Sequence, residues 1–323
     1  MRIVVVGGSG HIGTYLVPRL VQAGHDVVSL SRGASSPYAP SAEWADVQHV
    51  AADRVQEDLD GSFGRRIRDL RPDAVVDLLC FTLESARALV DDIRGHVGHL
   101  VHCGSLWRYG VAVNAPIREG QGTPPFGEYG IQKEAIARFL QAETRGGGMA
   151  TTSIDPGHIC GPGWGPVGPL GNRDPAVWHT LSAGETLRIP GSGAEFMHHV
   201  HAEDVAQAFH LAVENRDAAA GEDFHAVAAT ALNVHGLAHI AAGWFGQVAH
   251  LESIGWDRFR AENPSDVVST SWGHLHRNHV LSIDKAERVL GYAPQHRPEE
   301  AILAGLRWQI DVGEVTVSRP LEV

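Results

Sequence analysis

A tyrosine and a lysine four positions apart, Tyr129 and Lys133, are the residues of this chain whose spacing most directly suggests chemistry. On a helix they would lie one turn apart on the same face. A phenol titrates near a pH of about 10, and a neighbouring ammonium favours its anion, so the pair would make Tyr129 a usable acid or base. Ser105, at the end of an apolar run, would hold the oxygen that exchanges the proton. These three residues form the predicted catalytic group.

A glycine-rich loop near the amino terminus predicts a site for a dinucleotide. The apolar run 2–6 is typical of a buried parallel strand, and a helical pattern follows the glycines over 14–23. Glycines at such a turn let the backbone approach a pyrophosphate, which then lies at the helix amino terminus. Pro18 is expected to kink this helix slightly. The loop residues expected to bind the cofactor are Gly7, Gly10, His11, Ile12 and Gly13.

The end of the second predicted strand bears on the choice of cofactor. Ser31 and Arg32 stand there, where a dinucleotide fold meets the adenosine ribose. A carboxylate at this place would bind the ribose hydroxyls, whereas an arginine attracts a 2′-phosphate. The sequence therefore favours NADP over NAD. The alternative is that Arg32 only covers the adenine plane.

Along most of its length the chain resembles the extended short-chain dehydrogenase/reductases, the NAD(P)-dependent epimerase/dehydratase group. Its glycine loop matches the family's Gly-x-x-Gly-x-x-Gly, and Tyr129 with Lys133 matches Tyr-x-x-x-Lys. Ser105 matches the family's serine or threonine before a Tyr-Gly pair. The resemblance implies that Asp53 and Arg54 lie at the adenine. Further cofactor contacts assigned on this basis are Leu78, Leu79, Lys133, Pro156 and His158.

Alternating strand and helix patterns predict an α/β fold, a doubly wound parallel sheet of the Rossmann type with a smaller carboxy-terminal substrate lobe. The family architecture implies a cofactor domain of residues 1–155 plus about 199–231, and a substrate lobe of about 156–198 plus 232–323. The predicted strands are 2–7, 26–31, 47–51, 74–79, 98–103 and 151–155. The predicted helices are 12–23, 61–70, 83–95, 129–144 and 176–184.

The activity that the resemblance implies is hydride transfer between nicotinamide and a carbon bearing a hydroxyl or carbonyl group. Tyr129 would pass the proton, Lys133 would lower the tyrosine pKa and bind the nicotinamide ribose, and Ser105 would orient the oxygen. We therefore expect an NADP-preferring oxidoreductase for a small or medium hydroxylated substrate. The alternatives are a nucleotide-sugar epimerase that keeps bound NAD and, more remotely, a noncatalytic nucleotide-sensing or RNA-associated relative.

Two departures from the sugar-nucleotide members narrow this expectation. Leu106 and Trp107 follow Ser105, where 4,6-dehydratases carry the Asp-Glu pair that eliminates water. Glu195 stands close to the place where many relatives carry an arginine for diphosphate, and a carboxylate would repel that group. Candidate substrate contacts in this chain are Cys80, Trp107, His158, Trp164 and His199.

The cysteines could form a group of reactive thiols and the histidines a metal site, but the sequence around them supports neither. Cys80, Cys103 and Cys160 each follow a predicted strand, so either three thiols line one pocket or three small residues are buried beside a cofactor. The lack of an evident basic partner favours the second interpretation. The histidine runs 198–201 and 274–279 lack cysteines or helical i, i+4 support, so we expect no metal site.

Composition limits the partners and the compartment. A formal net charge of −12 opposes binding to nucleic acid or to an anionic membrane, and no apolar run is long enough to span a bilayer. Met1 leads directly into the first strand, and three cysteines, an odd number, suggest a reducing interior, so we expect a cytoplasmic protein. The family resemblance implies that helices 83–95 and 129–144 pair across a two-fold axis, which would make the protein a homodimer acting on a small molecule.

Overall fold

The computed structural model describes residues 1–33 and 36–323, and its central feature is a seven-stranded parallel sheet. The strand order is β11-β6-β5-β4-β1-β2-β3, so the chain winds outward in both directions from β1. The strands are β1 Arg2–Val6, β2 Asp26–Ser31, β3 Gln48–Ala51, β4 Ala74–Asp77, β5 His99–Cys103, β6 Ala150–Pro156 and β11 Asp223–Ala226. The predicted doubly wound α/β fold is confirmed.

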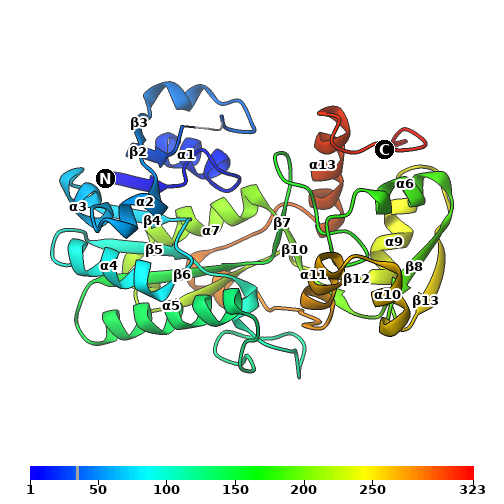
Figure 1. The fold of residues 1–323 in the computed structure, drawn as a ribbon. Helices are drawn as coiled ribbons and strands as arrows, with labels where there is room; N and C mark the ends of the chain where they lie inside the picture. Colours follow the sequence, from blue (N-terminus) through cyan, green and yellow to red (C-terminus); the bar gives the residue numbers. More distant parts are fainter. Residues whose placement is uncertain (34–35) are drawn as a thin grey trace.

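Helices cover both faces of this sheet (Figure 1). Along β1, Ile3 and Val5 enter the hydrophobic cluster under α1 and α7, whereas Val4 and Val6 enter the cluster under α3, α4 and α5. Because both faces are buried, the strand is a continuous apolar run rather than an alternating one. The helices around the sheet are α1 Gly13–Gln22, α2 Arg54–Leu59, α3 Phe63–Asp69, α4 Leu83–Ile93, α5 Glu128–Arg145, α7 Ala202–Glu214, α8 Arg216–Ala219 and α12 Asp284–Leu290.

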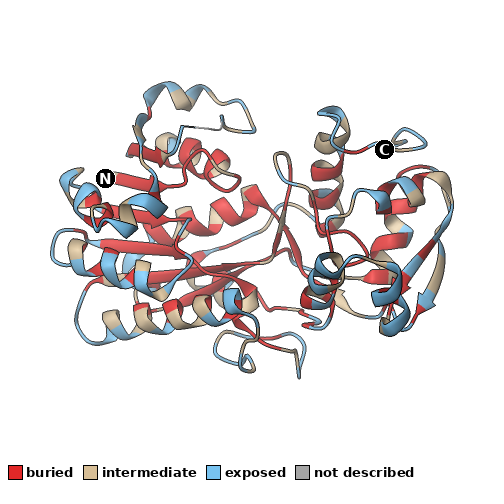
Figure 2. Cartoon of the chain, viewed as in Figure 1, coloured by how far each residue is buried: buried red, intermediate tan, exposed pale blue. Residues whose placement is uncertain are grey.

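A separate hydrophobic cluster, here called the second core, contains residues from Cys160 to Val315. Figure 2 shows its buried residues as a second red region away from the sheet. Its helices are α6 Ala176–Ala183, α9 Val234–Gly243, α10 Trp256–Glu262, α11 Ser265–Leu275 and α13 Pro298–Asp311. Short strands around it pair as β8 Thr186–Pro190 with β13 His250–Ile254, β7 His158–Cys160 with β10 His199–His201, and β9 Phe196–Met197 with β12 Leu232–Asn233. The 3₁₀ turns are η1 Ala42–Asp46 and η2 Leu106–Arg108.

The predicted strands and helices are all present, and their ends lie within two residues of the prediction. The seventh strand, β11, was not predicted because Asp223 and His225 interrupt its short apolar pattern. Helix α12 falls in the range expected of the substrate lobe, and its Leu290 packs in the core under α1 and α7. The division into two domains stays a prediction. Among the described residues, no helix combines the length and apolar character needed to cross a membrane.

The carboxyl edge of the sheet brings most of the predicted site together. In a doubly wound sheet, the loops at this edge form a crevice beside the strand where the order reverses, which here is β1. The loops that leave β1, β2, β3, β4 and β5 carry, in that order, Gly7, Arg32, Asp53, Leu79 and Ser105, and β7, one residue beyond β6, begins with His158.

Candidate active site

Ser105 is fixed at the end of β5 by two hydrogen bonds. Its Oγ accepts a hydrogen bond from the Trp107 backbone N at 3.1 Å, and its own backbone N donates to Asp155 Oδ1 at 3.2 Å. A Cβ at Gly104 would collide with the same Asp155 oxygen, so only glycine lets the two strand ends approach this closely. The hydroxyl therefore has a defined position at the edge of the sheet.

A buried ionic network supports the turn that carries Ser105. Arg108 donates to Asp155 at 3.0 Å, to Asp223 at 2.7 Å and to Glu134 at 2.7 Å. Tyr109 Oη donates to Asp155 at 3.1 Å. Burial raises the pKa of Asp155, and the Arg108 charge opposes that rise. The network ties β6, β11 and α5 to the Ser105 turn, and sequence patterns did not reveal it because its members lie far apart in the chain.

Tyr129 is the second residue of α5, and the glycine after it sets its place. A Cβ on Gly130 would lie 2.5 Å from the Trp107 carbonyl oxygen, so glycine allows the start of α5 to pack on η2. The Tyr129 ring lies 5.9 Å from the Trp107 ring and 6.5 Å from the Phe81 ring, measured between centroids. The phenol is therefore presented beside the Ser105 turn.

Lys133 lies one turn further along α5 and is only 1% exposed. Its Nζ donates to the carbonyl oxygens of Cys80 and Cys103, both at 2.7 Å. It lies 5.7 Å from the centroid of the Tyr129 ring. In the part of the chain that the structure describes, no carboxylate forms an ion pair with it. The predicted pairing of an ammonium with the phenol on one helix face is thus present.

The predicted lowering of the Tyr129 pKa is not what the structure gives. Tyr129 keeps 41% of its surface exposed, yet the residues packed around it withdraw enough water to raise the pKa to about 12. The Cys103 thiol adds to the rise, and the hydrogen bond with the Ser105 hydroxyl opposes it. Lys133 does not offset the loss of water, because its ammonium lies on the ring side and donates to two carbonyls.

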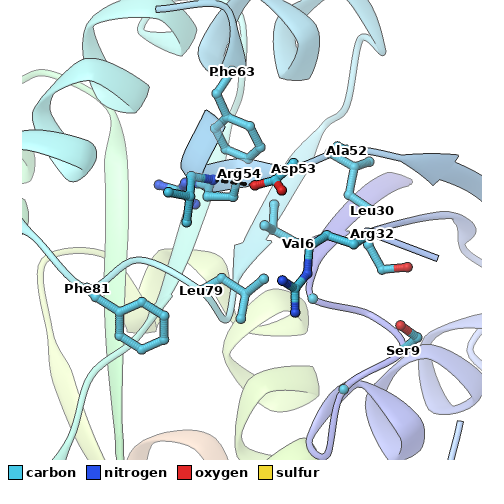
Figure 3. Close-up of a pocket in the computed structure, with 14 residues that line it drawn as sticks. Val6, Ser9, Leu30, Arg32, Ala52, Asp53, Arg54, Phe63, Leu79 and Phe81 are labelled. Carbon is cyan, nitrogen blue, oxygen red and sulfur yellow. Dashed lines mark hydrogen bonds between the residues drawn. The ribbon is translucent and has the colours of Figure 1, made fainter. Parts of the chain in front are cut away.

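A cavity of about 340 Å³ lies at the carboxyl edge of β1, β2, β3 and β4 (Figure 3). Arg32, from the end of β2, and Leu79, from the end of β4, enter it from two sides. The predicted cofactor residues that line it are Gly7, Gly10, Ser31, Arg32, Asp53, Arg54 and Leu79. Those that do not line it are His11, Ile12, Gly13, Leu78, Lys133, Pro156 and His158. Lining residues that the sequence did not reveal are Val6, Ser9, Leu30, Ala52, Val55, Phe63 and Phe81.

The glycine loop fits a dinucleotide phosphate. Gly7 has a φ of +87°, which favours glycine, and a Cβ at Gly13 would collide with the Gly8 carbonyl. A Cβ at Gly10 would lie 3.1 Å from the Gly7 carbonyl oxygen. The backbone can therefore turn tightly and start α1 at Gly13, and the amide groups at a helix amino terminus favour an anion such as a phosphate.

Arg54 and Asp53 both line the cavity but have different roles there. The Arg54 guanidinium donates to both oxygens of Asp77 at 2.6–2.7 Å and lies 4.2 Å over the Phe63 ring, so its charge is already neutralised. The Asp53 carboxylate caps α2 by accepting hydrogen bonds from two backbone amides, while the residue remains exposed. Of the two residues, Asp53 keeps free acceptor capacity toward the cavity.

Three histidines, here called the histidine wall, form a series of ring contacts that reaches Trp107. The His158 ring lies 5.3 Å from His199 and 4.9 Å from His274, and the His274 ring lies 4.9 Å from Trp107. Burial lowers the pKa of His199 and of His274 to about 4 and also lowers that of His158, so all three are neutral near pH 7.

Two ring nitrogens of the histidine wall, Nε2 of His158 and Nδ1 of His199, are buried and have no hydrogen-bond partner among the described residues. Such atoms call for a partner, and a hydroxyl group of a substrate would supply one. His158 and His199 were predicted as substrate contacts. His274 was noted only as part of a histidine run, since nothing in the sequence places α11 beside β7.

Of the other predicted substrate residues, Trp107 contacts the histidine wall, whereas Trp164 and Cys80 make other contacts. Trp164 contacts the His11 ring at 5.3 Å, on the glycine loop. The Cys80 thiol is buried and donates to the Thr82 carbonyl, so it faces the protein interior. Burial raises the pKa of Cys80 and of Cys160 to about 12, and that of Cys103 to about 11. All three thiols are buried, and their raised pKa values favour the second of the two interpretations.

Two groups of potential metal ligands occur in the described ranges, 1–33 and 36–323. The atoms of each group lie within 4.8 Å of one another. The groups are His25 with His210 and Glu214, and His201 with Glu203 and His296. Neither group includes a residue of the histidine wall. The expectation that no metal binds stays a prediction.

Comparisons with known proteins identify a family that matches most of the chain. The model of the NAD dependent epimerase/dehydratase family matches residues 3–82 and 81–226. The 2'-dehydrokanamycin reductase of Streptomyces kanamyceticus is 30% identical over 208 residues, which are 64% of this chain and 56% of the reductase. The chain thus spans little more than half the length of that relative.

A longer match is the UDP-glucose 4-epimerase of Mycolicibacterium smegmatis, which is 28% identical over 94% of this chain and 96% of the epimerase. Among solved structures, an epimerase of Methanothermobacter thermautotrophicus superposes with a TM-score of 0.73 at 22% identity. The alignment covers 97% of this chain and 93% of that one. This last likeness concerns the fold alone.

Proposed function

We propose that this chain, which belongs to the NAD-dependent epimerase/dehydratase family of extended short-chain dehydrogenase/reductases, is an NADP-preferring oxidoreductase for a hydroxylated small molecule. It would transfer a hydride between nicotinamide and a hydroxyl-bearing or carbonyl carbon. The observation that carries the proposal is the convergence of Ser105, Tyr129 and Lys133 at the sheet edge that also forms the cavity.

The cofactor supplies or accepts the hydride when it is bound. The glycine loop would hold its pyrophosphate, Asp53 its adenine and Lys133 its nicotinamide ribose. Arg32 lines the cavity near the expected ribose and would pair with a 2′-phosphate, which is the basis of the preference for NADP.

The cofactor carries the hydride, and the side chains of this protein would carry out the proton transfer. In reduction, the carbonyl carbon gains the hydride while its oxygen takes the proton from Tyr129 Oη. In oxidation, the phenolate takes the proton back. The Ser105 hydroxyl would hydrogen-bond to the same oxygen, and its hydrogen bond to Tyr129 favours the phenolate that remains after reduction. The phenol is protonated at neutral pH, as the reductive direction requires.

The histidine wall and Trp107 support a neutral, hydroxylated substrate. The wall offers uncharged hydrogen-bonding groups and an indole edge, and Trp107 occupies the position at which a dehydratase would need an acid or base. A homodimer formed through α4 and α5, which pack against each other, belongs to the same proposal.

A second candidate is a nucleotide-sugar epimerase. The full-length similarity to a UDP-glucose 4-epimerase favours it. Such an enzyme would keep its NAD bound through both half-reactions and would show no net oxidation.

The deciding experiment is calorimetric titration of the purified protein with NAD, NADH, NADP and NADPH, after denaturing a sample to detect any retained dinucleotide. Exchangeable NADP(H), followed by NADPH consumption with a panel of carbonyl compounds, supports the oxidoreductase. Tightly retained NAD(H) with interconversion of nucleotide sugars would instead establish the epimerase. Absence of any dinucleotide binding by the folded protein refutes both.

A further inference from the structure

Arg277, two residues beyond α11, is a buried cation without an acidic partner. The residue is 1% exposed, and no carboxylate in the described part of the chain pairs with it. Loss of water alone lowers the pKa of its guanidinium to about 10. Its Nε is buried and lacks a hydrogen-bond partner. A charge held in this way opposes folding, so its presence calls for another reason.

Two aromatic rings enclose the Arg277 guanidinium. Its central carbon lies 3.9 Å from the centroid of the Trp107 ring and 3.8 Å from that of Phe126. One terminal nitrogen donates to the Phe126 carbonyl oxygen at 2.7 Å, and the other donates to the Gly273 carbonyl. A planar guanidinium can lie flat between two rings and still donate from its edges, which neither lysine nor an aliphatic side chain can do.

These contacts reach the two segments that present the catalytic groups. Trp107 holds Ser105, because its backbone N donates to the Ser105 hydroxyl. Phe126 directly precedes Gly127, the residue that caps the amino terminus of α5. Tyr129 lies three residues after Phe126, in the first turn of that helix. One side chain therefore touches both the Ser105 turn and the start of the catalytic helix.

We propose that Arg277 is a positioning residue that sets the distance between the Ser105 hydroxyl and the Tyr129 phenol. The segment that follows α11 thereby completes a catalytic site whose reacting groups all come from the sheet edge. This inference rests on the proposed function, since it assigns Ser105 and Tyr129 to the same reaction step. A small displacement of groups that must share one oxygen is enough to slow the reaction strongly.

The chain offers a matched control for this arginine. Arg173 also lies over an indole, 5.3 Å from the centroid of the Trp164 ring, and donates to a backbone carbonyl. It is exposed, and Trp164 contacts the glycine loop through His11 rather than Ser105 or Tyr129. Removing its guanidinium takes away an arginine–indole contact without touching the catalytic pair.

The test compares Arg277→Met with Arg173→Met. For Arg277→Met we expect kcat to fall by about 100-fold, with dinucleotide affinity within about twofold of wild type and little change in the melting temperature. For Arg173→Met we expect kcat within about twofold of wild type. In Arg277→Ala, added guanidinium ions should restore part of kcat, and they should have no such effect on Arg173→Ala. Unchanged kcat in Arg277→Met, or a loss that only follows the unfolded fraction, would overturn the proposal.

A spectroscopic readout separates this inference from the proposed reaction. The ring-carbon resonance of isotope-labelled Tyr129, assigned by its absence in Tyr129→Phe, should shift in Arg277→Met and stay in place in Arg173→Met. This comparison needs no turnover. If the wild-type protein neither binds a dinucleotide nor turns over, the proposed function fails while the resonance still decides the role of Arg277. A resonance that does not move in Arg277→Met refutes the positioning role.

Discussion

At the sheet edge the candidate catalytic groups already have hydrogen-bond partners, whereas two ring nitrogens of the histidine wall have none among the described residues. The Lys133 ammonium donates to two carbonyls and the Ser105 hydroxyl accepts a backbone amide, while His158 and His199 each keep one buried nitrogen unpaired. Both regions contact Trp107, one through Tyr129 and the other through His274. The comparison suggests that the groups needed for proton transfer are held by the fold, and that the groups left unpaired select the substrate.

The largest difference we expect between the two regions is their response to acid. His199 and His274 have folded pKa values of about 4, against about 6.5 in an unfolded chain. The unfolded state therefore binds more protons between these values, and stability falls as the pH falls from 6.5 to 4. The loss is up to about 1.4 kcal/mol per pH unit for each histidine.

Urea unfolding at a series of pH values from 7 to 5 measures this loss. His274→Gln should reduce the pH slope of the unfolding free energy by about one proton. A slope identical to that of wild type would mean that His274 is already protonated in the folded wall, and the contrast with the sheet edge would weaken.

The next largest effect is expected for Tyr129→Phe. Loss of the proton donor should lower kcat by about 10²- to 10⁴-fold and leave dinucleotide affinity nearly unchanged. Tyr15→Phe is the control, because Tyr15, on α1, has a similarly raised pKa of about 12 but packs against His201. Steady-state kinetics and calorimetry provide the two quantities. A normal kcat in Tyr129→Phe would show that Tyr129 is not the proton donor.

A smaller effect is expected for Arg32→Ala, which tests the cavity end of the sheet edge. A lost arginine–phosphate contact should weaken NADP binding by about tenfold or more and change NAD binding little. Titration of both dinucleotides into the variant and the wild type gives the ratio. Equal losses for NAD and NADP would assign Arg32 to the adenine plane instead of the phosphate.

The smallest effect is expected in the histidine wall. His158→Ala should raise KM by about tenfold, which corresponds to the binding free energy of one lost hydrogen bond, and should leave kcat within a few-fold of wild type. His250→Ala, at an exposed position, is the control. A fall in kcat with unchanged KM would show that the wall takes part in the chemical step, and the division between the two regions would fail.

The sheet edge was open to prediction because its residues follow regular elements. Tyr129 and Lys133 are one helical turn apart, and the glycine loop directly follows a strand, so local spacing fixes their relation. The cavity wall was only partly predictable, since Phe63 and Phe81 come from segments without a recognisable motif.

The roles of three other residues depend on tertiary packing. The Arg54 charge is neutralised by Asp77, which stands 23 positions away. His274 and Arg277 reach Trp107 only because α11 packs beside the sheet edge. No sequence pattern specifies such contacts, because irregular segments join the second core to the sheet.

Lys133 joins two carbonyl oxygens, that of Cys80, three residues beyond the end of β4, and that of Cys103, the last residue of the adjacent strand β5. The lysine therefore stabilises the folded chain whether or not any reaction takes place. In a descendant that had lost its activity, mutation would remove the Tyr129 hydroxyl freely, whereas loss of Lys133 would still be selected against. A surviving lysine is thus poor evidence of catalysis among relatives, and a surviving tyrosine is the better marker.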